Sequence, residues 1–331
     1  MKKETQAKVD AVHAKITDQV VAALENGEAT GDWTKAWITD PHILSPMNPI
    51  TGKRYTAGNR ANLAFTAWLT PGYGAHWAGY SQWASLSRHT AACRALTDAK
   101  NRKRPRKEDC AELGCELVHV RKGEHSTPGL RPIIRHDYPT PGEDTLVGFA
   151  PIVLFNSAQI EGYTEPEPTK IVHDMTVAEQ FAEADAYAAR IGAVVIESKV
   201  DRAAYSPAKD QIEMPAHGKW ENPDDYWATL VHELIHWTGH DSRLKRGMFG
   251  QGDDAYAREE LVAELGAAFH LAHLGRSTVV RESHIKYLRH WIGQLREDPK
   301  LLWTAAGQAE SASKMLGRLH TTTMMKEEQP A

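Results

Sequence analysis

The sequence is poor in cysteine and has no long apolar run. Only three cysteines occur among 331 residues, which excludes a disulfide-rich secreted scaffold. No stretch of about eighteen apolar residues is present that could span a bilayer. The first residues are polar and helix-periodic, without the apolar core of a signal peptide. We therefore expect a cytoplasmic protein with reduced thiols and no membrane partner.

A strong excess of one charge is also missing. The chain carries 39 Lys+Arg and 43 Asp+Glu, a net charge of −4. The two halves differ, because residues 1–165 hold 20 basic and 18 acidic residues, a net of +2, while the remainder holds 19 and 25, a net of −6. A polyanion such as DNA is therefore expected to meet the first half.

The three cysteines, Cys93, Cys110 and Cys115, lie in a segment of unusual composition at about residues 86–115. Six basic residues fall within positions 100–107, which is typical of a solvated, mobile insertion, with a nucleic-acid-contacting arm as the alternative. We expect free thiols here. A zinc cluster with His89 is the other interpretation, but the paired Cys-x-x-Cys spacing is absent.

Periodicity predicts an α+β protein of two domains. The segment YTEPEPTKI at 163–171 alternates proline with charge, as interdomain linkers do. The first domain is then an α+β module at 1–165, loop-rich over 29–80, and the second is a mainly helical domain with a small sheet at 166–320. Residues 321–331 are expected to be a disordered tail. The helices expected in the second domain lie at 177–191, 224–239, 255–275, 280–294 and 299–319.

The stretch HELIHWTGH at 232–240 carries the chemistry of the second domain. Residues four apart on a helix share a face, so His232 and His236 present both imidazoles to one point, as two Zn²⁺ ligands require. Glu233 is positioned to act as the general base toward water. We expect one Zn²⁺ per chain and a zinc metallopeptidase, with a strand just before the motif as the edge strand that aligns a peptide.

A third ligand is expected from the helix YAREELVAELGAAF. The spacing of Glu260 and Glu264 resembles the Glu-x-x-x-Asp arrangement of gluzincins, which implies Glu260 on the metal and Glu264 bonded to a ligand histidine. Tyr256 is a candidate to polarise a substrate carbonyl. His240 is too far along the helix to share the ion, and the metzincin pattern would need a histidine where Ser242 stands.

Aromatic residues interleaved with cations mark the first half as a single-stranded nucleic-acid site, since unpaired bases stack on rings while phosphates meet Lys or Arg. Packing in the core is the alternative role for each ring. The candidate DNA-binding residues are Trp33, Lys35, Trp37, Asn48, Lys53, Arg54, Tyr55, Asn59, Arg60, Arg121 and Lys122.

Taken in order, these motifs resemble a known family. TDQVVAALENG, the W-x-x-x-W at 33–37, GKRY-x-x-GN, YSQW, RKGEHST and VLFN-x-x-QIEGY are similar to the single-stranded-DNA-binding domain of ArdC-type antirestriction proteins, a domain shared with TraC-type plasmid primases. HELIHWTGH, RLKR and YAREELVAELGAAF are similar to their zincin-type metallopeptidase domain. The resemblance covers about residues 8–275. The insertion at 86–115 departs from it.

The resemblance implies a protein of a mobile element, such as a conjugative plasmid, that binds incoming single-stranded DNA and protects it from host restriction. A host restriction or defence protein would be the peptidase substrate. Two alternatives stay open. The first is a DNA-shielding protein whose zincin domain is catalytically silent, and the second is a metalloprotease whose first half is a protein-interaction module.

Overall fold

The computed structural model describes residues 3–30, 40–102, 105, 107–137, 140, 142–168, 174–247, 253–276 and 291–327. The chain forms two compact units, and the expectation of an α+β fold with two domains is confirmed. Unit 1 comprises residues 1–12, 46–55 and 66–168, and unit 2 comprises 13–45, 56–65 and 169–331. The expected boundary was a single cut at residue 165, whereas two early segments pack with the C-terminal helices.

Unit 1 is built on short antiparallel sheets. The first has the order β1-β4-β3 and contains a long hairpin, and the second pairs β2 with β5. Its elements are β1 (Trp77–Ala78), α3 (Tyr80–Ala84), β2 (His119–Val120), β3 (Thr127–Arg135), β4 (Thr145–Asn156), the 3-10 helix η1 (Ser157–Gln159) and β5 (Ile160–Glu161).

The core of unit 1 is apolar and contains buried tryptophan. Its buried members are Ala78, Trp83, Val118, Val120, Phe155 and Ile160. The Trp83 indole donates to the carbonyl of Phe155 at 3.0 Å, which satisfies the polar atom of a ring that is fully buried. Gly162 follows β5 with a φ of +80°, and a Cβ there would lie 2.1 Å from the carbonyl oxygen of Leu117. Only glycine fits this position of the QIEGY motif.

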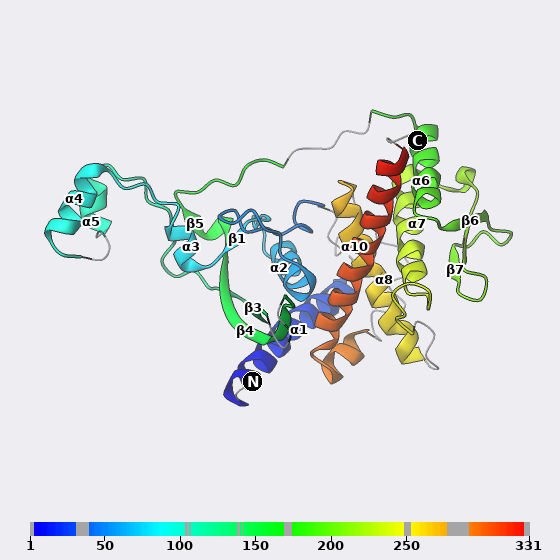
Figure 1. The fold of residues 1–331 in the computed structure, drawn as a ribbon, viewed down its shortest axis with the longest axis horizontal. Coiled ribbons are helices and arrows are strands. Elements are labelled where there is room, and N and C mark those ends of the chain that lie inside the picture. The colour runs from blue at the N-terminus through cyan, green and yellow to red at the C-terminus, as the bar shows by residue number, and fades with distance from the viewer. Residues whose placement is uncertain are drawn as a thin grey trace. The chain divides into compact units, whose positions relative to one another are not determined.

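The insertion forms two helices, α4 (Ala91–Ala99) and α5 (Lys107–Glu112), which lie side by side in Figure 1. The Thr90 hydroxyl accepts from the amide of Cys93 and so caps α4. Arg88 and Glu116 exchange two backbone hydrogen bonds, of 2.8 and 3.0 Å, and close the base of the insertion. The described part of this segment is therefore ordered secondary structure.

The loop-rich interpretation of 29–80 is wrong in part, because α2 (Ala57–Leu69) is a helix. Most of its positions are buried, including the polar Arg60 and Asn62, so the sequence shows no exposed polar face from which a period could be read. Gly58 faces Trp303, and a Cβ at that glycine would lie 2.0 Å from the ring. The glycine of the GKRY-x-x-GN motif therefore serves close packing within unit 2.

Unit 2 joins a small sheet to a helical bundle. The sheet order is β6-β8-β7, with β8 parallel to β6 and antiparallel to β7. The elements are α1 (Lys3–Thr30, shared with unit 1), α6 (Val177–Arg190), β6 (Val194–Glu197), β7 (Ala204–Ser206), β8 (Gln211–Met214), the 3-10 helix η2 (His217–Lys219), α7 (Pro223–Thr238), α8 (Asp253–His273) and α10 (Leu301–Glu327). The strand before the motif is β8, so the prediction that it is an edge strand is wrong.

Helix α7 runs through the interior of unit 2, next to α8 in Figure 1. Asn222 caps its first turn by accepting from the amide of Asp225, and Pro223 occupies the first helical position. The helices approach closely where Gly266 faces Ile235, because a Cβ on the glycine would lie 2.9 Å from that side chain. This approach brings the glutamates of α8 beside the histidines of α7.

The C-terminal end differs from the expected tail. Helix α10 continues to Glu327, and the Thr323 hydroxyl donates to the carbonyl of Arg190 at 2.9 Å. Residues 321–327 are therefore helical and anchored to α6. The helix expected at 280–294 falls largely outside the described residues. Among the helices that the structure describes, none has the length and apolar character needed to cross a membrane.

His270 links three helices of unit 2. It is fully buried on α8, its Nε2 lies 2.6 Å from the Tyr187 hydroxyl on α6, and its Nδ1 lies 3.3 Å from the Ser313 hydroxyl on α10. Burial, and then the charge of His273, lower the pKa of His270 to about 3. Between about pH 3 and pH 6.5 the ring is therefore neutral in the folded protein, whereas the same histidine in the unfolded chain would be charged.

This linkage predicts a loss of stability on acidification. The unfolded chain binds a proton at His270 below a pH of about 6.5 and the folded chain does not, so the free energy of unfolding falls by about 1.4 kcal/mol per pH unit from 6.5 toward 3. In His270→Asn this part of the slope should disappear in denaturant titrations at several pH values. His136→Asn, at an exposed position, is the matched control. An unchanged slope in His270→Asn would contradict the linkage.

Candidate metal centre and nucleic-acid surface

Three buried side chains from two helices meet at one point. His232 and His236 come from α7 and Glu260 from α8, and one ligand atom of each lies within 4.8 Å of the others. The two Nε2 atoms are 3.2 Å apart, and the Glu260 carboxylate lies 3.6 Å from His232 Nε2 and 3.4 Å from His236 Nε2. All three residues are less than a tenth exposed.

These distances fit a tetrahedral metal ion. Ligand atoms about 2.0–2.1 Å from one ion at tetrahedral angles lie roughly 3.3–3.4 Å from one another. Two imidazole nitrogens and a carboxylate oxygen are also the donor set of catalytic zinc sites with an open fourth position. The residues present therefore fit a Zn²⁺-type ion, and the predicted ligand set comes together as expected.

A carboxylate lies beside the other ring nitrogen of each histidine. Glu264 Oε1 is 2.9 Å from His232 Nδ1, and Glu259 Oε1 is 3.2 Å from His236 Nδ1. Such partners fix the ring orientation and make Nε2 the metal-facing nitrogen. Glu264 thus stands where the sequence placed it. Glu259, which the sequence analysis did not assign, takes the matching place beside His236.

The centre holds more negative than positive charge. Burial by itself would raise the pKa of the Glu260 carboxyl, but the two histidines hold that pKa well below its usual range. Burial lowers the pKa of His236, yet the contacts with Glu259 and Glu260 outweigh it and raise that pKa to about 10. So many buried carboxylates must be balanced by positive charge. Protonated histidines or a bound divalent ion can provide that charge.

Glu233 is held by the sheet. Its carboxylate accepts a hydrogen bond of 2.8 Å from the backbone amide of Tyr205 on β7, and the side chain is buried. The predicted base is therefore oriented by the edge strand that packs against α7. Tyr256 lies one turn before Glu260 on α8 and is 42% exposed. His240 lies in the turn after α7, where its Nδ1 accepts from the amide of Ser242 and lies 2.8 Å from the Ser242 hydroxyl.

Two arginines of the RLKR segment complete the end of α7. Arg243 donates to the carbonyl of Trp237, and its guanidinium lies 3.9 Å from the Trp237 ring centroid. Arg246 donates to the carbonyl of Ile235 and contacts both oxygens of Glu259 at 3.1 and 2.7 Å. Arg246 therefore positions the carboxylate that positions His236. The RLKR motif alone does not indicate this role, because it depends on the contact of Arg246 with Glu259 on another helix.

The predicted DNA-binding residues lie in different environments. Lys53, Arg54, Arg121 and Lys122 are exposed on turns of unit 1. Tyr55 is half-buried, and its hydroxyl donates to the carbonyl of Trp77 at 3.0 Å. Trp33, Lys35 and Trp37 lie outside the described residues. The exposed cations thus come from two turns of unit 1, at 48–55 and 121–124.

Two candidates are structural. Asn48 is buried, and its side-chain oxygen accepts from the amides of Ile50 and Thr51, so it shapes the turn that carries Lys53. Arg60 is buried within unit 2, where it donates to the carbonyls of Leu44 and Phe269 and pairs with Glu310 at 3.2 Å. The prediction of these two as DNA contacts is corrected accordingly. Asn59, on α2, is only partly exposed.

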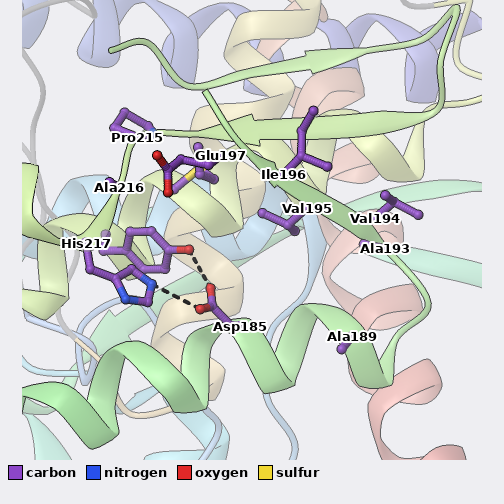
Figure 2. Close-up of a pocket in the computed structure, with 12 residues that line it drawn as sticks. Asp185, Ala189, Ala193, Val194, Val195, Ile196, Glu197, Pro215, Ala216 and His217 are labelled. Atoms are coloured by element: carbon purple, nitrogen blue, oxygen red, sulfur yellow. Dashed lines mark hydrogen bonds and ion pairs between the residues drawn. The ribbon is translucent and has the colours of Figure 1, made fainter. Parts of the chain in front are cut away.

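A pocket of about 510 Å³ lies elsewhere in unit 2, and Figure 2 shows its lining. Strand β6 forms one wall, and Asp185 on α6 contacts both His217 Nε2, at 3.0 Å, and the hydroxyl of Tyr226, at 2.5 Å. None of the three candidate metal ligands lines it. The pocket is therefore separate from the metal centre.

Two family models match the two parts of the chain. The N-terminal domain of anti-restriction factor ArdC matches residues 10–144, and a zincin-like metallopeptidase domain matches residues 182–308. The first contains the exposed cations of unit 1, and the second contains the candidate metal centre.

Relatives match both parts at once. Protein y4eC of Sinorhizobium fredii is 30% identical over 303 residues, which cover 90% of this chain and 89% of that protein. A DNA primase TraC of Escherichia coli is 30% identical over 307 residues, but the chain spans only 19% of that primase. Two crystal structures of the antirestriction protein ArdC from plasmid R388 are 28% identical. The metal-free form has a TM-score of 0.65 and covers 94% of this chain and 98% of its own, and the Mn(II)-bound form has 0.66, 93% and 97%.

The contact of Glu264 with His232 predicts that removing this charge weakens metal binding. Glu264→Gln should lower the affinity about 10–100-fold, because the imidazole loses its orienting partner and part of its basicity. Competition against a chromogenic chelator measures the change. Glu197→Gln, at an exposed position of β6, should bind as the unaltered protein does, and equal affinity of the two variants would show that Glu264 has no such role.

Proposed function

The chain belongs to the ArdC family of antirestriction proteins, and on that premise we propose that it binds single-stranded DNA and protects DNA entering a cell from restriction. The alignment with the R388 protein over nearly the full length of both chains is the observation that carries the proposal. The match of residues 10–144 to the N-terminal ArdC domain supports unit 1 as the DNA-binding part. The carrier would be a plasmid or other mobile element.

The DNA-binding surface is assigned to the two exposed turns of unit 1. Lys53 and Arg54 follow a turn that Asn48 holds from inside and that passes through Gly52 at a φ of +67°. Lys122 precedes a second glycine at positive φ, Gly123. We expect these turns to present the cationic side chains to solvent. There the side chains can neutralise DNA phosphates.

Rings near these turns are the proposed stacking partners of bases. Tyr80, from the YSQW motif, is 57% exposed and packs edge-on against Phe155, with ring centroids 6.3 Å apart. Tyr55 stands beside the cations of the first turn. Trp33 and Trp37, with Lys35 between them, are proposed as DNA contacts from the family resemblance alone. Stacking of this kind tolerates any base, as a protein that coats incoming DNA requires.

We further propose that unit 2 is a zinc metallopeptidase with His232, His236 and Glu260 as ligands. A divalent ion held there supplies a Lewis acid toward a peptide carbonyl. Glu233, oriented by the Tyr205 amide, accepts the proton of the attacking water at its carboxylate. Tyr256 is assigned to donate a hydrogen bond to the carbonyl oxygen. The substrate class is a host restriction or defence protein.

Removing the exposed cations tests the DNA-binding proposal. The triple variant Lys53→Ala, Arg54→Ala and Lys122→Ala should bind single-stranded DNA more weakly, and the slope of log K against log salt should shrink by about 2, because each lost phosphate contact contributes roughly 0.7. Fluorescence anisotropy across a salt series measures both. The matched control removes three exposed lysines of unit 2, Lys199, Lys209 and Lys219. An identical slope in the two triple variants would rule out this surface.

Glu233→Gln tests whether peptide hydrolysis serves protection. The variant should retain metal and DNA binding but lose about 10²–10⁴-fold in hydrolysis, since the amide cannot take a proton. The survival of unmodified DNA in a restricting host should decrease together with the rate of hydrolysis. Full protection by Glu233→Gln would instead support the DNA-shielding alternative with a silent zincin unit. Absence of single-strand affinity at low salt would support a protease with a protein-interaction module.

A further inference from the structure

The insertion between α3 and β2 gathers every cysteine of the chain around one histidine. The ligand atoms of His89, Cys93, Cys110 and Cys115 all lie within 4.8 Å of one another. Cys93 Sγ is 3.4 Å from Cys110 Sγ, and Cys110 Sγ is 3.5 Å from His89 Nδ1. We propose that these four side chains bind a structural zinc ion, separate from the metal centre of unit 2.

The geometry is that of one tetrahedral ion. Sulfurs about 2.3 Å from zinc lie roughly 3.8 Å apart at tetrahedral angles, with a sulfur and an imidazole nitrogen slightly closer. The measured separations are near these values without any movement of the backbone. Four protein ligands leave no position for substrate, which is the mark of a structural and not a catalytic site.

The spacing also fits, although it contains no Cys-x-x-Cys. Three residues separate His89 from Cys93 and four separate Cys110 from Cys115, both within the range of ligand pairs in zinc modules. A local feature of the backbone brings the two ligands of each pair together. The Thr90 cap starts α4 so that Cys93 falls in its first turn, and Gly114, at a φ of +66°, reverses the chain after α5 so that Cys115 returns to Cys110.

A second observation points to the same ion, because the insertion has almost nothing else to hold it together. Among its described residues from 89 to 115, the buried ones are Cys93, Thr97 and Cys110. Asp109 forms ion pairs with Arg102, at 2.6 Å, and with Lys100, at 3.7 Å, and both pairs are partly exposed and contribute little. Two short helices without an apolar core do not offset the entropy of ordering them, whereas a four-ligand zinc site does.

The positions of the four ligands indicate which parts of the insertion the ion would connect. His89 and Cys115 directly follow and precede Arg88 and Glu116, whose backbone hydrogen bonds close the base of the insertion. Cys93 and Cys110 lie on the two helices that flank the basic segment 100–107. One ion thus joins the base to both helices and fixes the two ends of the basic segment. The expected count of one metal per chain becomes two.

Metal analysis of the full chain, purified anaerobically without chelator, tests the proposal. The protein should contain two zinc equivalents. Cys93→Ser/Cys110→Ser should lose one and retain the other, and His232→Ala/His236→Ala should show the reverse, so failure of either site is distinguishable. Ala95→Ser, which adds a hydroxyl on an exposed position of α4, is the matched control and should keep both.

Cobalt substitution identifies the ligands. Thiolate-to-cobalt charge-transfer bands should appear in the wild-type protein, persist in His232→Ala/His236→Ala and vanish in Cys93→Ser/Cys110→Ser. A wild-type spectrum without these bands would overturn the proposal. So would a Cys93→Ser/Cys110→Ser variant that still holds two zinc equivalents, or a disulfide between Cys93 and Cys110 in the anaerobically isolated protein.

Discussion

Burial of charge between α7 and α8 is the constraint on which unit 2 depends. Four glutamates, two histidines and one arginine are enclosed there with little access to water, and each carboxylate has an imidazole, a guanidinium or a backbone amide beside it. Removing a buried charge from its partner costs several kcal/mol. Both the fold and the geometry of the candidate metal site therefore depend on the close approach at Gly266 and on the capped ends of α7.

The same constraint connects the edge of the sheet to the chemistry. The backbone amide of Tyr205 on β7 donates to Glu233. Arg246, in the turn after α7, donates to Glu259 and so holds that carboxylate beside His236. Neither residue faces the expected position of the ion, yet both fix the atoms that do. Such an arrangement holds a candidate metal site in a fixed geometry, because the candidate ligands come from helices and their orientation comes from a surrounding layer of hydrogen bonds.

Unit 1 uses the residues of its motifs in two different ways. Asn48 and Gly162 are needed inside the fold, where one shapes a turn and the other admits a carbonyl oxygen, and they leave Lys53 and Lys122 exposed at the surface. Among its described residues, the insertion has no apolar core and gathers cysteines instead. The motifs of this chain therefore mix buried residues that shape the backbone with exposed residues that are proposed to contact DNA.

By itself, the sequence determined whatever depends on local geometry. The shared helix face of His232 and His236 follows from their four-residue spacing, the choice of Glu260 follows from the resemblance to gluzincins, and the α+β class follows from the pattern of apolar residues. Only the tertiary structure decided the rest. It buried Arg60, made β8 a central strand, and brought Cys93 to Cys110 across the insertion. Those outcomes depend on contacts between residues far apart in the chain, where the energy of burial and pairing overrides local preference.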